Sequence, residues 1–313
     1  MKRILTALVL IPLVLLVVFR APDWLLFALL GVVAMLALWE YLEIAGAYGL
    51  PRFRLTTLLL AAAFFALLAA DLLRTPMNPI FWTRGLHVFF WTLVLLLFAP
   101  FLYLCVALAS VKREAVEGSA DMRAAISGAA MACFGIPYIA GALVCLGLMR
   151  MEWHGWLLVL FTFVAVWVGD TAAMYVGKAF GRIKFSPRIS PKKTWEGAIA
   201  SVAGAVVACV VLGHYAPRLE NALIHFDLVQ AVYPPLLTVN AGVAALAAAI
   251  INVAAQLGDL FESLIKRGAG VKDSGTLLPG HGGILDRIDA LLFAAPVALL
   301  LFALLGDRFA AMH

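Results

Sequence analysis

The stretch "ILDRIDALLFAAPVALLLFALL", residues 284–305, decides the fold class. Its first six positions hold Asp286, Arg287 and Asp289, and the next sixteen positions carry no charge. A helix that crosses a bilayer needs roughly 20 mostly apolar residues. The stretch therefore predicts a membrane helix with charged residues at its N-terminal end. Directly upstream, residues 268–283 hold six glycines, which predicts an irregular loop before this helix.

The composition extends this prediction to the whole chain. The 313 residues are 65% hydrophobic and 13% charged, whereas a soluble domain carries about 25% charged residues. The mean hydropathy of +1.02 also indicates an integral membrane protein. In such a protein the net charge of +5 is explained by basic cytoplasmic loops, so we expect the membrane as a partner and no nucleic acid.

Weakly charged segments predict an all-α, polytopic membrane protein. Backbone N–H and C=O groups in lipid must pair within a segment, which favours helices over open strands. We expect one domain, with N-terminal helices in residues 1–150 and, in residues 156–306, the helices and loops that carry the candidate site residues. Nine spans are predicted, at residues 4–19, 24–45, 55–70, 89–109, 125–149, 156–177, 198–215, 241–262 and 288–306.

The basic residues predict the orientation. With the N-terminus in the cytoplasm, 17 of the 23 lysines and arginines fall in cytoplasmic loops, as the positive-inside tendency requires. The basic and apolar N-terminus is interpreted as a retained first helix, because no small-residue cleavage motif follows it. Two charged loops, in residues 170–196 and 259–289, then face the cytoplasm, and we expect the active site there.

Polar residues form a stripe on the eighth predicted span. Asn252, Gln256, Asp259 and Ser263 are spaced so that they share one helical face. Interhelical hydrogen bonding is the favoured interpretation for Asn252 and Gln256. For Asp259 a functional role is favoured, because an ionised carboxylate in an apolar helix needs a cation.

Two further sets of acids have competing interpretations. Asp286 and Asp289 are three positions apart and predict a shared Mg²⁺ site, the alternative being helix capping. Asp170, inside an apolar run, is a possible site residue or one half of a salt bridge. Glu40 and Glu43, at the end of the second span, are interpreted as interfacial, structural residues.

Two loops predict phosphate binding. The segment "SPRISPKKTWEG", residues 186–197, is expected to be a rigid loop because of Pro187 and Pro191. Its hydroxyls and ammonium groups suit phosphate or, alternatively, anionic lipid. The glycine-rich segment 267–283 brings backbone amides close to oxyanions, while the role of His281 is left open. The candidate phosphate-binding residues are Ser190, Lys192, Lys193, Thr194, Gly282 and Gly283.

Residues 263–289 resemble the signature of phosphatidate cytidylyltransferases. The run "SLIKRGAGVKDSGTLLPGHGGILDRID" agrees with it at a dozen or more positions, and "GDTAAMYVGKAFGR" with "SPKKTWEG" resembles the family's second hallmark. One position departs from the family pattern. A tyrosine is usual four positions after the aspartate aligned with Asp170, but here that position is Met174 and the tyrosine is Tyr175.

The resemblance implies that CTP and phosphatidic acid react to give CDP-diacylglycerol and pyrophosphate. It also implies Mg²⁺, with K⁺ as a second cation. By resemblance the metal ligands are Asp259, Asp286 and Asp289, with Asp170 as a further candidate. The candidate catalytic residues are Asp259, Lys266, Arg267, Lys272, Asp273, His281, Asp286 and Arg287.

Other functions fit parts of the sequence. A CTP-dependent lipid kinase, or a cytidylyltransferase for an isoprenoid lipid phosphate, would use a similar scaffold. An ion-coupled transporter would also place acids in the membrane, but transporters usually show related halves, and no internal repeat is evident. The oligomeric state is left open, a homo-oligomer being one alternative.

Overall fold

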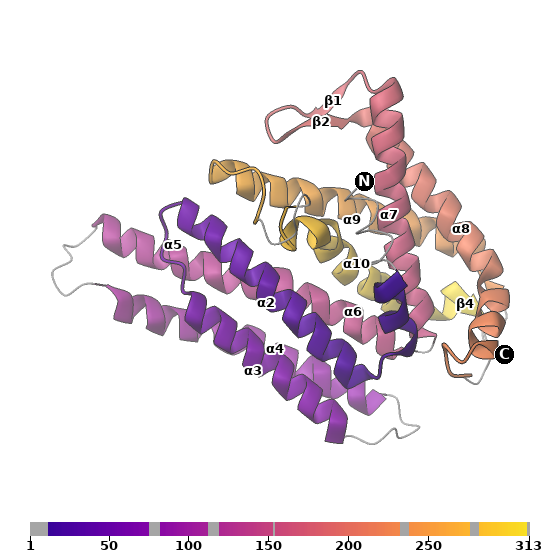
Figure 1. The fold of residues 1–313 in the computed structure, drawn as a ribbon, viewed down its shortest axis with the longest axis horizontal. Helices are drawn as coiled ribbons and strands as arrows, with labels where there is room; N and C mark the ends of the chain where they lie inside the picture. Colours follow the sequence, from indigo (N-terminus) through magenta and orange to yellow (C-terminus); the bar gives the residue numbers. More distant parts are fainter. Residues whose placement is uncertain are drawn as a thin grey trace. The chain divides into compact units, whose positions relative to one another are not determined.

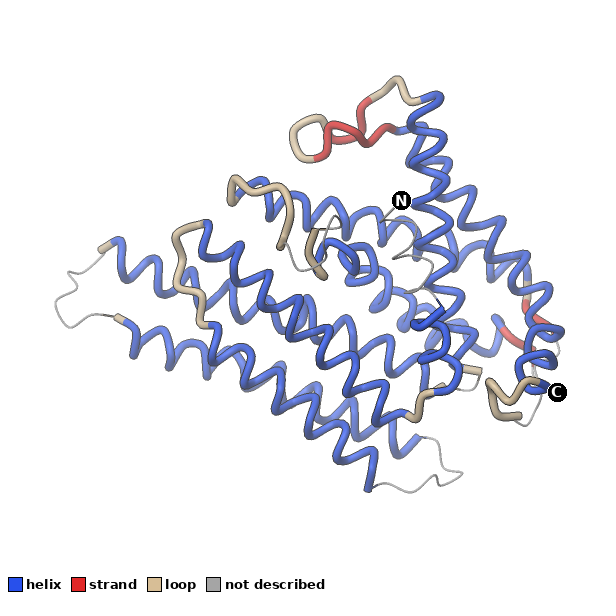
Figure 2. The backbone as a smooth tube through the Cα atoms, in the orientation of Figure 1, coloured by secondary structure: helices blue, strands red, loops and turns tan. Residues whose placement is uncertain are grey.

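The structure is a computed structural model that describes residues 12–74, 82–111, 119–152, 154–231, 238–275 and 282–311. Most of these residues are helical, and the strands are short (Figures 1 and 2). The elements are α2 (Asp23–Ala47), α3 (Arg54–Arg74), α4 (Trp82–Ser110), α5 (Ala120–Gly135), the π-helical turn Ile136–Gly141, α6 (Ala142–Met151), α7 (Gly155–Phe180), β1 (Lys184–Ser186), β2 (Ser190–Thr194), α8 (Trp195–His225), β3 (Thr238–Val239), α9 (Ala241–Gly268), α10 (Leu285–Phe309) and β4 (Ala310–Ala311).

Long apolar helices dominate the chain, as predicted. Eight helical segments within the described residues are long and apolar enough to cross a membrane. One of them joins α5, the π-helical turn and α6 into the single segment Ala120–Met151. Of the first predicted span, residues 4–19, the part 12–19 is helical and the remainder lies outside the described residues. The all-α polytopic fold is therefore confirmed, whereas the count of nine is not.

The chain divides into two compact units. One holds the described residues of Pro22–Gly147 and Leu264–Ile288, and the other those of Met1–Ala21, Leu148–Ser263 and Asp289–His313. The segment Leu264–Ile288 thus belongs with the N-terminal helices, whereas the sequence grouped it with the later ones. This grouping places all but the first and last residue of the signature, residues 263–289, in the unit that α2 to α5 build.

In the unit of Pro22–Gly147 and Leu264–Ile288, small residues bring the helices together. A Cβ added to Gly31 of α2 would lie 2.8 Å from the Cβ of Phe65 on α3. A Cβ added to Gly135 of α5 would lie 2.9 Å from Tyr41 on α2. The Tyr41 hydroxyl donates to the backbone oxygen of Met131 at 3.1 Å. Close packing of small residues is how membrane helices associate without a hydrophobic driving force.

In the other unit, α7 and α8 lie side by side, and the hairpin β1–β2 connects them (Figure 1). The sequence predicted a rigid loop for residues 186–197, but Lys184 pairs with Thr194 and Ser186 with Ser190 in an antiparallel ladder. Pro187 lies in the turn between the strands, where its missing N–H costs no ladder bond. The prediction of a constrained segment holds, but its form is a hairpin.

Asn252 and Gln256, the first two residues of the polar stripe on α9, form the interhelical hydrogen bonds that the sequence favoured for them. The Asn252 side chain is buried and donates to the backbone oxygen of Ala165 on α7 at 2.9 Å. The Gln256 amide donates to Asn252 Oδ1 at 2.8 Å and to the backbone oxygen of Ala198 on α8 at 3.2 Å. These bonds hold α7, α8 and α9 together and position Asp259 one turn further along α9.

We predict that Gly258→Ala destabilises the protein. A Cβ on Gly258 would lie 2.6 Å from the backbone oxygen of Asp289 on α10, and backbone cannot move aside as a flexible side chain can. Such overpacking costs about 1–3 kcal/mol. Thermal unfolding in detergent measures the loss. In the control Gly242→Ala the added Cβ meets only Asn240 Oδ1, at 3.4 Å, and stability should change little. Equal stability of the two variants would contradict the prediction.

Candidate active site

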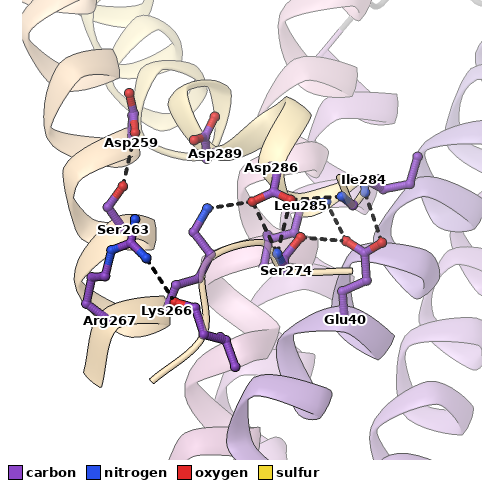
Figure 3. A network of polar contacts seen from close by, with 12 residues as sticks. Glu40, Asp259, Ser263, Lys266, Arg267, Ser274, Ile284, Leu285, Asp286 and Asp289 are labelled. Atoms are coloured by element: carbon purple, nitrogen blue, oxygen red, sulfur yellow. Dashed lines mark hydrogen bonds and ion pairs between the residues drawn. The ribbon is translucent and has the colours of Figure 1, made fainter. Parts of the chain in front are cut away.

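A lysine and an aspartate form the first predicted cluster. Lys193 Nζ on β2 lies 2.7 Å from Asp259 Oδ2 on α9. Ser263, one turn along α9, donates to Asp259 Oδ1 at 3.4 Å (Figure 3). Asp170 on α7 lies close enough to interact electrostatically with both Asp259 and Lys193. Three residues that the sequence singled out separately are therefore brought together by α7, the hairpin and α9.

The hairpin that carries Lys193 is attached to α8 by specific bonds. The Glu196 carboxylate accepts from the backbone N–H groups of Arg182 at 3.0 Å and Ile183 at 3.1 Å. Thr194 is buried, and its hydroxyl oxygen accepts from the Gly197 N–H at 3.2 Å, which caps α8. These anchors leave Lys192 exposed and Ser190 half-buried on β2.

Asp286 lies at the centre of the second cluster, in the unit of Pro22–Gly147 and Leu264–Ile288. Its Oδ1 accepts from Lys266 Nζ at 2.5 Å, and its Oδ2 accepts from the N–H groups of Ser274 at 3.0 Å and Gly283 at 2.8 Å (Figure 3). The side chains of Lys266 and Asp286 are only 11% and 10% exposed. Two halves of the glycine-rich segment thus converge on one carboxylate.

Glu40 of α2 lies in the same network and was missed as a site residue. It is 5% exposed, and it accepts from the Ser274 hydroxyl and from the N–H groups of Ile284 and Leu285 (Figure 3). The sequence interpreted Glu40 as an interfacial, structural residue. An acid within an apolar helix is itself a functional signal, as it was for Asp170, and that signal could have identified Glu40.

The donor set around Asp259 suits a hard divalent cation. Mg²⁺ typically takes one or two carboxylates from the protein and fills its other positions with water and substrate phosphate. No group of three or more His, Cys, Asp or Glu residues gathers within the residues described. Asp259 has one ion pair, one long hydrogen bond and a side chain 36% exposed, so it fits that role. Asp286 could bind a cation only by giving up its bond to Lys266.

The other predicted site residues lie at the surface of their units. Arg267, Lys272, Asp273 and Arg287 are exposed, and Asp289 is half-buried. Gly282 has φ +80, a conformation that favours glycine, and an added Cβ would meet the Asp286 carboxylate. His281 lies outside the described residues. Met174 and Tyr175 are both exposed on α7.

Comparison with known proteins identifies the family of this chain. The model of the cytidylyltransferase family matches residues 1–305. The chain belongs to that family. A phosphatidate cytidylyltransferase of Haemophilus influenzae is 34% identical over 314 residues, which cover 94% of this chain and 96% of that relative. Relatives of the same name from Brucella suis and Bacillus subtilis are 38% identical, over 58% and 50% of this chain and 60% and 51% of their own lengths. The family resemblance of residues 263–289 is therefore confirmed.

Proposed function

We propose that the protein is a membrane enzyme that transfers the cytidylyl group of CTP to phosphatidic acid, giving CDP-diacylglycerol and pyrophosphate. One observation carries the proposal: the family model matches residues 1–305, and the phosphatidate cytidylyltransferase of Haemophilus influenzae matches 94% of this chain. The two clusters of acids and lysines supply groups suited to a highly charged substrate.

The chemistry explains why such groups suffice. A phosphate oxygen of the lipid attacks the α-phosphorus of CTP, a new P–O–P bridge forms, and the bond to the β-phosphate breaks to release pyrophosphate. The attacking phosphate is already anionic near neutral pH, because its second pKa is about 6, so no strong general base is needed. The obstacle is repulsion between anions, and positioning with electrostatic stabilisation overcomes it.

The proposal assigns roles by charge. Lys193 and Lys266, each now paired with an aspartate, are suited to bind phosphate oxygens, as are the exposed Lys192, Arg267 and Lys272. Asp259 would hold Mg²⁺, with K⁺ as a second cation, and Asp289 and Asp170 are further candidate ligands. When bound, Mg²⁺ neutralises charge on the triphosphate. We place the active site at the cytoplasmic face of the cell membrane, where CTP is available and where the basic loops are expected.

The proposed reaction is tested with purified protein in detergent micelles that contain phosphatidic acid. CTP labelled at the α-phosphate should transfer its label to the lipid, and CTP labelled at the γ-phosphate should not. Chelation of Mg²⁺ should abolish the transfer, because the anions would no longer be neutralised. Omission of K⁺ should lower the rate.

The same assay separates the alternatives. Diacylglycerol and a polyprenyl phosphate replace phosphatidic acid in parallel reactions. Transfer of the γ-label to diacylglycerol would establish a CTP-dependent lipid kinase instead. Preferential transfer of the α-label to the polyprenyl phosphate would establish an isoprenoid cytidylyltransferase, and either result would overturn the proposed substrate.

A further inference from the structure

Glu40 is a buried carboxylate that binds a distant part of the chain. Its Oε2 accepts from the Leu285 N–H at 2.8 Å and from the Ser274 hydroxyl at 3.0 Å, and its Oε1 accepts from the Ile284 N–H at 3.0 Å. All of these residues belong to the unit of Pro22–Gly147 and Leu264–Ile288. Glu40 therefore links α2 to Ser274 in the glycine-rich segment and to the two residues that directly follow that segment. These partners lie about 240 positions away in the sequence.

The bonded amides explain what this carboxylate does. Ile284 and Leu285 lie at the start of α10, where backbone N–H groups have no partner within the helix. A negative charge there is also favourable to the helix dipole. Glu40 thus acts as a cap supplied by another helix, and it fixes where α10 begins. Asp286 is the next residue, so its position depends on that cap.

Ser274 couples the two carboxylates. Its hydroxyl donates to Glu40, and its N–H donates to Asp286. Glycines make this approach possible: a Cβ on Gly275 would lie 2.6 Å from Glu40 Oε1, and a Cβ on Gly283 would overlap both Glu40 and the Ser274 hydroxyl. Two of the signature glycines therefore leave room for Glu40 itself.

A second contact links the end of α2 to α9, just before the glycine-rich segment. The Tyr48 hydroxyl, just beyond the end of α2, donates to the backbone oxygen of Ile265 at 2.8 Å, one position before Lys266. This donor is protonated near neutral pH, as tyrosines ordinarily are, and partial burial raises the pKa of Tyr48 further above its usual value. Each member of the Lys266–Asp286 pair is therefore next to a backbone group that the α2 region holds.

We propose that Glu40 is a positioning residue, which fixes the start of α10 and thereby orients Asp286 for cytidylyl transfer. The catalytic part of this inference rests on the proposed function. The structural part, that Glu40 protects the first amides of α10, does not depend on it. A misplacement of about 1 Å can lower a catalytic rate about 100-fold, so loss of this cap should act mainly on kcat.

The test compares Glu40→Gln with Glu43→Gln. Glu43 is also on α2, but it pairs with Arg52 and Arg54. In Glu40→Gln, hydrogen exchange at Ile284 and Leu285 should accelerate about tenfold or more, because one acceptor is replaced by a donor and the charge is lost. The kcat should fall roughly 10- to 100-fold, while KM for CTP changes little. Glu43→Gln should behave like wild type.

A second variant keeps the test informative if Glu40→Gln does not fold. Ser274→Ala removes one of the three bonds but retains the Glu40 charge, and it should accelerate the same exchange and lower kcat by a smaller factor. Where both variants fold, the double variant should be no worse than Glu40→Gln, since the two residues act through one contact. Unchanged exchange at Ile284 and Leu285 would overturn the proposal. Altered exchange with wild-type kcat would reject the catalytic role alone, and an inactive wild type would reject the proposed function.

Discussion

Replacing Asp259 by asparagine is expected to lower the rate of cytidylyl transfer about 100- to 1000-fold. Asparagine keeps the size of the side chain but removes the charge that binds Lys193 at 2.7 Å. A neutral amide is also a poor ligand for Mg²⁺, which prefers carboxylate oxygens. The rate of α-label transfer from CTP, measured across a Mg²⁺ titration, checks the prediction. Added Mg²⁺ should restore little of the lost activity.

Two further variants serve as a control and as a test of the partner of Asp259. Asp227→Asn removes another exposed acid of the same unit, one that pairs with Arg20 at 2.9 Å, and should leave activity unchanged. Lys193→Met removes the ion-pair partner of Asp259 and an ammonium that we propose binds phosphate, so it should raise KM for CTP without abolishing the Mg²⁺ response. If Asp259→Asn retained wild-type activity, the assignment of Asp259 to the metal would be wrong.

The helices and their polar faces could be predicted from the sequence. Apolar length predicts each span, and the i, i+4 spacing of Asn252 and Gln256 predicts one face, which the bonds to Ala165 and Ala198 confirm. These are local properties of a helix. The hairpin of Lys184–Thr194 was harder to predict, because its strands are only three and five residues long and β2 contains Pro191, a residue type that is rare in strands.

The partners of the charged residues could not be predicted. The sequence assigned acids to metals and lysines to phosphates as separate groups. The structure pairs them, Lys193 with Asp259 and Lys266 with Asp286. Buried charges require compensation, but spacing along the chain does not reveal which residue supplies it. For the same reason the contacts of Glu40 could not be predicted, because its partners Ser274 and Leu285 are distant in sequence.

Paired charges have a consequence for the binding of substrate. In each pair a lysine neutralises an aspartate, and this compensation matters most for Lys266 and Asp286, whose side chains are nearly buried. Binding of a phosphate to the lysine requires that the aspartate find another cation. If that cation is Mg²⁺, nucleotide and metal should bind with positive coupling. Substrate affinity and metal affinity would then rise together, as reciprocal linkage requires.

Replacing Asp286 by asparagine is expected to reduce both stability and activity. The side chains of Lys266 and Asp286 are only 11% and 10% exposed, so the variant would leave a nearly buried ammonium without its counter-charge. Removing one partner of a buried pair costs about 3–5 kcal/mol. Thermal unfolding in detergent should show this loss. Asp71→Asn, which removes a more exposed acid bonded to His87 at 3.0 Å, should have little effect.

The double variant Asp286→Asn with Lys266→Met separates stability from catalysis. A neutral side chain in place of the lysine removes the uncompensated charge, so most of the lost stability should return. Activity should not return, because the Asp286 carboxylate and the Lys266 ammonium, which we propose binds phosphate, are then both missing. An active double variant would show that the Lys266–Asp286 pair stabilises the fold but has no role in catalysis. A double variant as unstable as Asp286→Asn would instead show that the bonds from Ser274 and Gly283 to Asp286 carry its stabilising role.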